Sequence, residues 1–571
     1  MYLDKVLLMK QISITEEDQQ LLTLLEDEWN NMMFNIPEMA TFLGNHDYND
    51  RLTDLSEEAI EKNHQHNLHV LQKLKDMNLN TLSTENKINY DLFVEKVEED
   101  IREHNFKSYL MPLNQMDGVQ NTFIYTIQIM PFKTYKDFEN YLSRLEFFPE
   151  YIDQLIHLMT IGHETGYTVP KAAIVNVVSQ IRDQLPQDYK ESVYFKVINE
   201  SKSTLEKIKT EIEKQIQNSL YPAFKKLADF LEKDHIPKCR DTYGLSALPN
   251  GDDYYNHKLK MMTTTDLTAT QIHEIGNTEV KRIYNEMLDV AAKLGYEDRY
   301  DQFLEHIKTD PQFYFTDPQD LMVSYRDIAK RADKELPALF KVLPRLPYGV
   351  EEIPAYQAPS YPTAYYMPAD MGMTRAGVFY ANTYQLEIRP KYEMEALTLH
   401  EAVPGHHLQI ALSMELDNLP KFRKMAVSGY TGYIEGWGLY SEKLGIDMGF
   451  YKDLYSKFGQ LCFEMWRACR LVVDTGLHAF EWSREQSIDY MQKKTGKSFE
   501  ACAVEVDRYM SIPGQATAYK IGELKILELK EKFKTNKRDD FDIREFHDVI
   551  LKNGALPLNV LENYVNEYLA S

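Results

Sequence analysis

Residues 396–409, ALTLHEAVPGHHLQ, form the stretch around which the other candidate functional residues of this chain are arranged. An apolar run leads into the pair His400–Glu401, and a Pro-Gly step then precedes a second pair, His406–His407. On a helix, a His-Glu pair followed by another His is typical of zinc hydrolases, in which imidazoles bind the metal and the carboxylate handles a proton of the attacking water. The usual second His lies four residues after the first, and in this sequence a proline takes its place.

The Pro-Gly step changes the geometry that the stretch can adopt. Pro404 cannot donate to the carbonyl of His400 and its ring crowds that carbonyl, while Gly405 tolerates unusual backbone angles. On a straight helix His406 would lie about 240° around the axis from His400, and His407 would return to within about 20° but lie roughly 10.5 Å further along. A two-residue loop-out would restore the i+4 position to His406. We therefore expect the helix to break at residues 403–405, and His406 rather than His407 to bind a metal; a buried, hydrogen-bonded His cluster at a kink is the alternative.

A zinc site of this kind needs a third protein ligand, often a Glu from a following helix. Glu435 lies 34 residues after Glu401, between Ile434 and Gly436, and few surface carboxylates have such neighbours. Glu442, beside Ser441 and Lys443, reads as more exposed. The expected ligand set is His400, His406 and Glu435.

Composition excludes several classes of function. The net charge of −24 argues against nucleic-acid binding, and 43% hydrophobic with 27% charged residues is typical of a folded chain. No run of 18 apolar residues predicts a membrane span, and the first residues lack the pattern of a secretory signal. The four Cys form no metal-binding pattern. Cytoplasmic residence is the resulting expectation.

The chain reads as mostly α-helical. Residues 14–110, 136–165 and 188–235 show amphipathic helical spacing, and loop-forming residues at 241–265 suggest a boundary between lobes 1–240 and 241–571. The irregular stretch 354–385 ends in a predicted strand, 377–384, which contains Tyr380. This strand could pair with an extended peptide or simply cover the core.

A later helix, within residues 461–482, carries polar residues on an otherwise apolar sequence. Arg467, Arg470, Asp474 and His478 follow each other at helical spacing on one face. They could support the metal ligands or bind a substrate carboxylate, or they could form a structural ladder of ion pairs.

Several stretches together resemble a known family. GLSALPNGDDYY, TTTDLTATQIHEIG, GVFYANT, HEAVPGHHLQ, YIEGWGLYSE, RLVVDTGLH and PGQATAYKIGELKILELK resemble the bacterial domain-of-unknown-function 885 proteins, which are similar to helical zinc peptidases of the thimet oligopeptidase and angiotensin-converting enzyme type. The resemblance covers most of residues 244–530. It implies a helical fold with a deep channel, zinc held by His400, His406 and Glu435, Glu401 as general base and Tyr519 as oxyanion donor. Many relatives carry a lipoprotein signal, and no Cys precedes Cys239 in this chain, so we expect no such anchor.

The sequence therefore predicts a zinc metallopeptidase that acts on short peptides inside a channel, as a monomer or homodimer. His407, Arg470, Asp474, His478 and Tyr380 are expected to support the ligands or to contact substrate. Two other hypotheses remain open: a non-catalytic peptide- or metal-binding protein on the same scaffold, and a zinc amidohydrolase acting on a non-peptide amide.

Overall fold

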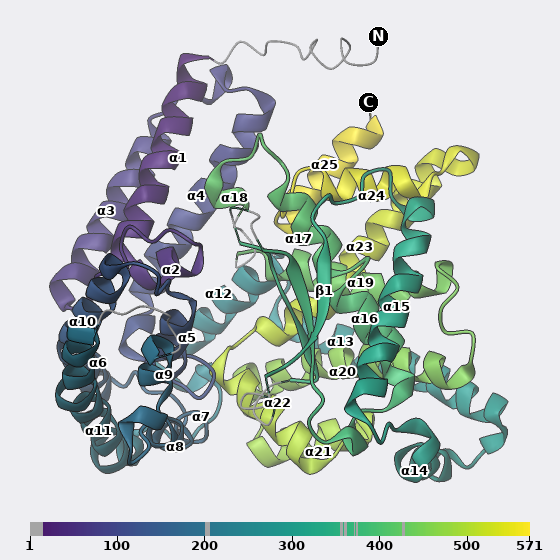
Figure 1. Cartoon of the computed structure of the whole chain (residues 1–571). Coiled ribbons are helices and arrows are strands. Elements are labelled where there is room, and N and C mark those ends of the chain that lie inside the picture. Colours follow the sequence, from purple (N-terminus) through teal and green to yellow (C-terminus); the bar gives the residue numbers. More distant parts are fainter. Residues whose placement is uncertain are drawn as a thin grey trace.

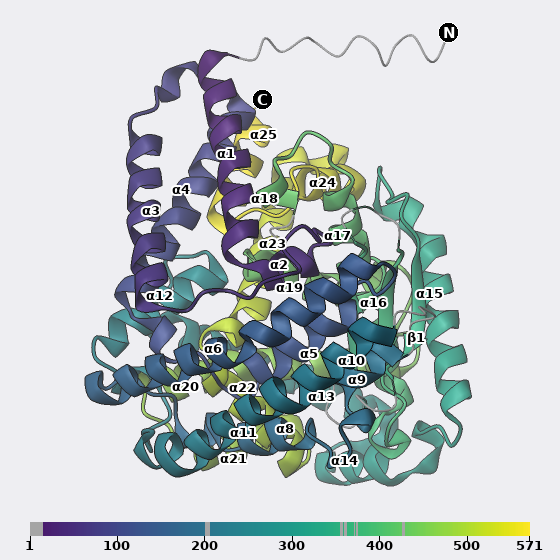
Figure 2. The same ribbon diagram turned by 60° about the vertical axis from the view of Figure 1, so that its left-hand side comes forward.

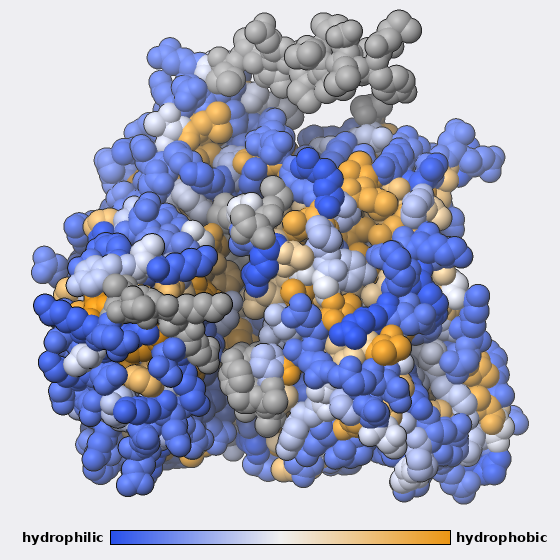
Figure 3. All heavy atoms as spheres, in the orientation of Figure 1, coloured by the Kyte–Doolittle hydropathy of each residue, from blue (hydrophilic) through white to orange (hydrophobic). Residues whose placement is uncertain are grey.

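The fold is seen in a computed structural model that describes residues 15–199, 206–354, 358, 362–370, 372, 375–424 and 429–570. The prediction of a mostly helical protein with a small sheet is confirmed (Figure 1). Figure 1 shows the helices of the first 240 residues gathered on the left and most of the later helices on the right. In Figure 2 the N-terminal helices come forward and lie in front of many of the later ones. The space-filling view shows a hollow between these two parts, with apolar side chains on its walls (Figure 3).

The N-terminal part is built from helices whose starts follow ordinary capping signals. The side chains of Thr15 and Thr134 each accept a hydrogen bond from the backbone N–H of an Asp three residues on. The carboxylate of that Asp in turn accepts a hydrogen bond from the backbone N–H of the Thr. Apolar side chains from these helices form their own buried clusters. The helices are α1 (Glu16–Asn35), α2 (Pro37–Phe42), α3 (Glu57–Lys75), α4 (Thr84–Asn105), α5 (Val119–Ile129), α6 (Tyr135–Thr165), α7 (Lys171–Ile174), α8 (Val177–Asp183), α9 (Val193–Asn199), α10 (Glu206–Gln215) and α11 (Tyr221–Phe230).

The C-terminal part contains a second, larger core. Trp437, Leu399 and Ile526, from three different helices, are all fully buried in it. Burying apolar surface from so many helices supplies the main driving force that orders them. The helices are α12 (Gly251–Thr263), α13 (Ala269–Ala291), α14 (Tyr300–Thr309), α15 (Pro318–Leu339), α16 (Met394–Glu401), α17 (His406–Met414), α18 (Lys421–Lys424), α19 (Thr431–Asp447), α20 (Leu454–Ala479), α21 (Arg484–Thr495), α22 (Phe499–Ser511), α23 (Gln515–Lys537), α24 (Ile543–Leu551) and α25 (Leu558–Ala570).

A three-stranded sheet lies against α15, α16 and α17. Its order is β1 (Tyr348–Glu352), β3 (Gly377–Ala381) and β2 (Ala364–Met367), with β1 parallel and β2 antiparallel to β3. The predicted strand at 377–384 therefore exists as β3 but ends at Ala381. Because β3 is the central strand, it is paired with β1 over Gly377–Ala381 and with β2 over Val378–Ala381. The expectation that it could pair with a peptide is therefore wrong.

Glycines let two helices that carry candidate site residues approach closely. A Cβ atom on Gly436 of α19 would lie only 2.5 Å from the Cα of Gly522 on α23. Only residues without side chains allow two backbones to come this near. The crossing brings Glu435, next to Gly436, to the same region as Tyr519, one turn before Gly522.

Candidate metal centre

The helix that carries His400 and Glu401 is interrupted at residues 402–405, one residue earlier than the predicted break at 403–405. Helix α16 ends at Glu401, α17 begins at His406, and the Val403–Pro404 peptide bond between them is cis. The indole N–H of Trp437 on α19 donates to the Pro404 carbonyl at 2.8 Å, which ties this connection to the neighbouring helix. The break returns His406 to the side of His400.

Three side chains converge at this break. The Nε2 atoms of His400 and His406 lie 3.5 and 3.4 Å from the same Oε2 atom of Glu435. The two imidazole rings stand nearly perpendicular, with centroids 4.7 Å apart. Space for the first ring exists because a Cβ on Gly438 would lie 2.7 Å from its Cε1 atom. The expected ligand set is therefore brought together by α16, α17 and α19.

The donor set fits a zinc ion. Tetrahedral coordination at the usual zinc–nitrogen and zinc–oxygen distances separates neighbouring ligand atoms by about 3.4 Å, close to the separations observed. Two imidazoles and one carboxylate are also the donor types that suit zinc. Among the residues that the structure describes, these are the only three His, Cys, Asp or Glu side chains that gather closely enough to hold a metal ion.

Glu442 supports the cluster from behind. Its Oε1 atom lies 2.8 Å from Nδ1 of His400, and Arg467 lies 3.3 Å from the same oxygen. A carboxylate on the far nitrogen of a metal-binding imidazole fixes the ring and leaves the other nitrogen free to coordinate. The interpretation of Glu442 as exposed is wrong, because its side chain is 0% exposed. The missed signal was spacing: seven residues after Glu435 is two turns along the same helix face.

The contacts within the cluster shift the ionisation of its members. Burial lowers the pKa of His400, but the hydrogen bonds to Glu435 and Glu442 outweigh it and raise the pKa to about 9. For Glu435 burial acts in the other direction and raises the pKa, but hydrogen bonds from His400 and His406 hold this pKa well below its ordinary value. Without a metal, the cluster is thus a proton-bearing imidazole beside an ionised carboxylate. A cation held by these side chains would displace that proton.

His407 does not face this cluster. Tyr366 donates from its hydroxyl to Nδ1 of His407 at 2.9 Å, and Nε2 lies 3.1 Å from the Leu346 carbonyl. Burial lowers the pKa of His407 to about 4, so the ring is neutral at pH 7. This side chain links α17 to the sheet instead of joining the candidate ligands.

Glu401 and Tyr519 lie beside the cluster in different ways. Glu401 is the last residue of α16 and is partly exposed, and within the described part of the chain its carboxylate has no hydrogen-bond or ion-pair partner. Tyr519 of α23 is 7% exposed, and its ring centroid lies 6.5 Å from that of His400. A carboxylate and a phenol beside one candidate metal site are groups that an acid–base mechanism can use.

The polar residues of α20 have different surroundings: Arg470 contacts Tyr519, whereas Asp474 contacts residues away from the candidate metal centre. The guanidinium of Arg470 lies 4.5 Å from the ring centroid of Tyr519 and 3.0 Å from Glu505. Asp474 instead accepts hydrogen bonds from Tyr255 at 2.6 Å and from the backbone N–H of Gly514 at 3.1 Å. These partners lie outside α20, so Arg470 and Asp474 do not form the ladder that their spacing allowed.

Two further expected residues make contacts away from the cluster. His478 accepts at Nδ1 from the backbone N–H of Leu245 at 3.1 Å and donates from Nε2 to the Tyr509 carbonyl at 3.0 Å. Tyr380 stacks on Tyr365 of the neighbouring strand, with ring centroids 5.1 Å apart. These contacts connect backbone segments in the case of His478 and neighbouring strands in the case of Tyr380.

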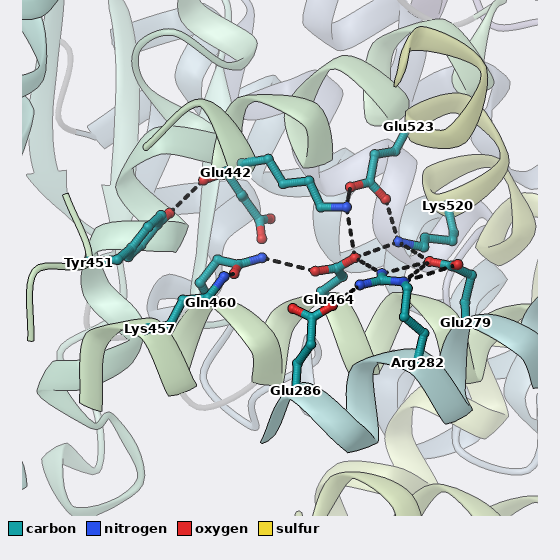
Figure 4. Close-up of polar contacts among 11 residues, drawn as sticks. Glu279, Arg282, Glu286, Glu442, Tyr451, Lys457, Gln460, Glu464, Lys520 and Glu523 are labelled. Atoms are coloured by element: carbon teal, nitrogen blue, oxygen red, sulfur yellow. Dashed lines mark hydrogen bonds and ion pairs between the residues drawn. The ribbon is translucent and has the colours of Figure 1, made fainter. Parts of the chain in front are cut away.

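A buried network of charges joins α13, α20 and α23 next to the site (Figure 4). Lys520, which follows Tyr519, is fully buried, and its ammonium lies 2.8 Å from Glu464, 2.7 Å from Glu523 and 2.9 Å from Glu279. A buried ammonium persists only when carboxylates replace its lost hydration. The network therefore fixes the register of the helix that carries Tyr519.

Comparison with known proteins gives the class of this chain. Residues 37–565 match the family described as bacterial proteins of unknown function, DUF885, and the chain belongs to that family. A search of curated proteins finds no match.

Two solved structures share the fold. One is described as a proposed lipoprotein from Colwellia psychrerythraea, with 28% identity and a TM-score of 0.91 over 97% of this chain and 100% of that one. The other is a proposed lipoprotein of unknown function from Shewanella oneidensis, with 17% identity and a TM-score of 0.69 over 96% of this chain and 100% of that one.

These relatives correct one expectation. The prediction of cytoplasmic residence is contradicted, because both similar structures are described as proposed lipoproteins. In the ranges that the structure describes, no helix is long and apolar enough to cross a bilayer.

Proposed function

We propose that the protein is a zinc-dependent hydrolase that cleaves amide bonds in short peptides. The observation that carries the proposal is the convergence of His400, His406 and Glu435 on one point, with the unpaired carboxylate of Glu401 next in sequence to the first of them. A binding protein would need the three donors but gains nothing from an adjacent carboxylate held without a partner.

Each side chain has a distinct role in this proposal. His400, His406 and Glu435 would hold the zinc ion, which would supply Lewis-acid polarisation of the scissile carbonyl and acidify the attacking water. Glu401 takes the proton of that water and delivers it to the leaving amine. Tyr519 donates a hydrogen bond to the oxygen on which negative charge develops.

The shape of the molecule is consistent with binding of a flexible substrate. The hollow between the two helical parts has apolar walls that suit side chains of an extended chain (Figure 3). Glu442 and Arg467 keep the cluster rigid from the opposite side, so an incoming substrate meets a preorganised site.

Digestion of a mixed peptide library, read by mass spectrometry, tests the proposal. We expect the wild-type protein to produce fragments, a chelator to stop their formation, and added zinc to restore it. The matched control is Glu401→Gln, which removes the proton acceptor but none of the three donors; it should keep the zinc and lose hydrolysis by several orders of magnitude. Tight peptide binding without fragments would identify a binding protein, and cleavage by Glu401→Gln within a few-fold of wild type would refute the mechanism.

A further inference from the structure

The hydroxyl of Tyr519 receives hydrogen bonds from two side chains. Arg508 donates from Nη2 at 3.3 Å, and Gln515 donates from Nε2 at 3.4 Å. The orientation of the Gln515 amide is fixed because its Oε1 atom accepts a separate hydrogen bond from Arg508 at 2.8 Å. Both donors therefore occupy the lone pairs of the Tyr519 oxygen.

This arrangement determines what the hydroxyl can do. A phenol has one proton and two acceptor positions. With both acceptor positions taken, the Tyr519 proton is the remaining hydrogen-bonding capacity, and among the described residues it has no acceptor. The ring lies beside His400, so an acceptor supplied by a substrate carbonyl would complete the set.

A second guanidinium fixes the ring. Arg470 lies over the face of Tyr519 at 4.5 Å from its centroid. Glu505 joins the two cations, at 3.0 Å from Arg470 and 3.5 Å from Arg508. Ring and hydroxyl are thus held by one connected set of charges on α20 and α22.

We propose that Arg508, with Gln515, is a positioning residue that holds the Tyr519 hydroxyl as a hydrogen-bond donor toward the reacting carbonyl oxygen. The inference rests on the proposed function and adds two residues to it. Neither residue needs to touch substrate, because both act through the tyrosine.

A double-mutant cycle separates action through Tyr519 from other roles. The variants are Arg508→Met, Tyr519→Phe and the double variant, with Arg508→Lys as the conservative form. Arg484→Met is the matched control. Arg484 begins α21 and pairs with Asp507, the neighbour of Arg508 on α22, and no contact between Arg484 and Tyr519 is found among the described residues. For each we would measure kcat and KM on a cleaved peptide, and the affinity of a peptide phosphinate that mimics the tetrahedral transition state.

The expected losses follow from the hydrogen bonds. Tyr519→Phe should lower kcat about 100-fold, as for one oxyanion donor. Arg508→Met should lower kcat and phosphinate affinity about 10- to 100-fold with little change in KM, as for a charge-assisted hydrogen bond. Arg508→Lys should recover part of this loss, and Arg508→Met should cost nothing further when Tyr519 is already Phe.

Three results would overturn the inference. Equal losses from Arg508→Met in both backgrounds would show that Arg508 does not act through Tyr519. A loss confined to peptides with a free C-terminal carboxylate, sparing the amidated forms, would make Arg508 a substrate-binding residue. Absence of both hydrolysis and phosphinate binding in the wild-type protein would refute the proposed function, and this inference with it.

Discussion

Replacing Glu442 by Gln changes only the charge behind the candidate metal centre. The carboxylate is fully buried, lies 2.8 Å from Nδ1 of His400 and also pairs with Arg467 at 3.3 Å. The amide can still accept a hydrogen bond from the imidazole, so the ring should stay in place. Loss of the carboxylate lowers the basicity of the imidazole and typically weakens metal binding 10- to 100-fold. This corresponds to about 1.4 to 2.7 kcal/mol of binding free energy.

The assay is a competition for zinc between metal-free protein and a chromogenic chelator. Asp447→Asn is the matched control, because Asp447 lies on the same helix α19 but its side chain is 53% exposed. Circular dichroism of the metal-free variants establishes that the fold is retained. Zinc affinity of Glu442→Gln within twofold of wild type, with an intact fold, would refute the support that we assign to Glu442.

Three other predictions address the ligands and the scaffold. His406→Ala should lose zinc whereas His407→Ala should keep it, measured by metal analysis of the purified variants; the reverse result would reassign the ligand. Lys520→Met removes the fully buried cation of the network and leaves its carboxylates only the partly exposed Arg282 and Lys443. It should lower the unfolding free energy by about 3 kcal/mol, measured by denaturant titration; a midpoint equal to that of wild type would contradict this. Burial raises the pKa of Asp474 to about 7, so the folded protein keeps a proton that the unfolded chain releases near pH 4, and wild-type stability should fall relative to Asp474→Asn as pH rises from about 4 to 7. A stability difference that did not change over this pH range would show that Asp474 is ionised throughout.

Local sequence rules were enough to place the central break. Pro404 cannot continue a helix past His400, and the turn angles of an α-helix then decide which later His can return to the same point. The structure ends α16 at Glu401 and starts α17 at His406, with the side chain of His406 and not His407 in the cluster. The predominance of helix was also readable, because amphipathic spacing persists through most of the chain.

Other features depend on contacts that local sequence does not encode. Glu442 was misread because its neighbours Ser441 and Lys443 are polar, yet α19 is buried on nearly all sides. The central position of β3 depends on its pairing with β1 and β2, which its own sequence does not specify. Arg508 reaches Tyr519 from a different helix, and no spacing pattern connects them.

Metal analysis of the wild-type protein and Glu435→Ala tests the central claim most directly. Both would be purified, loaded with zinc and freed of unbound metal, with circular dichroism as the test of folding and Asp447→Asn as the control. We predict about one zinc per chain in wild type and in the control, and loss of most of the metal in Glu435→Ala with the fold preserved, because one of three protein ligands is removed. A wild-type protein that retains no zinc, or full occupancy in Glu435→Ala, would contradict the account.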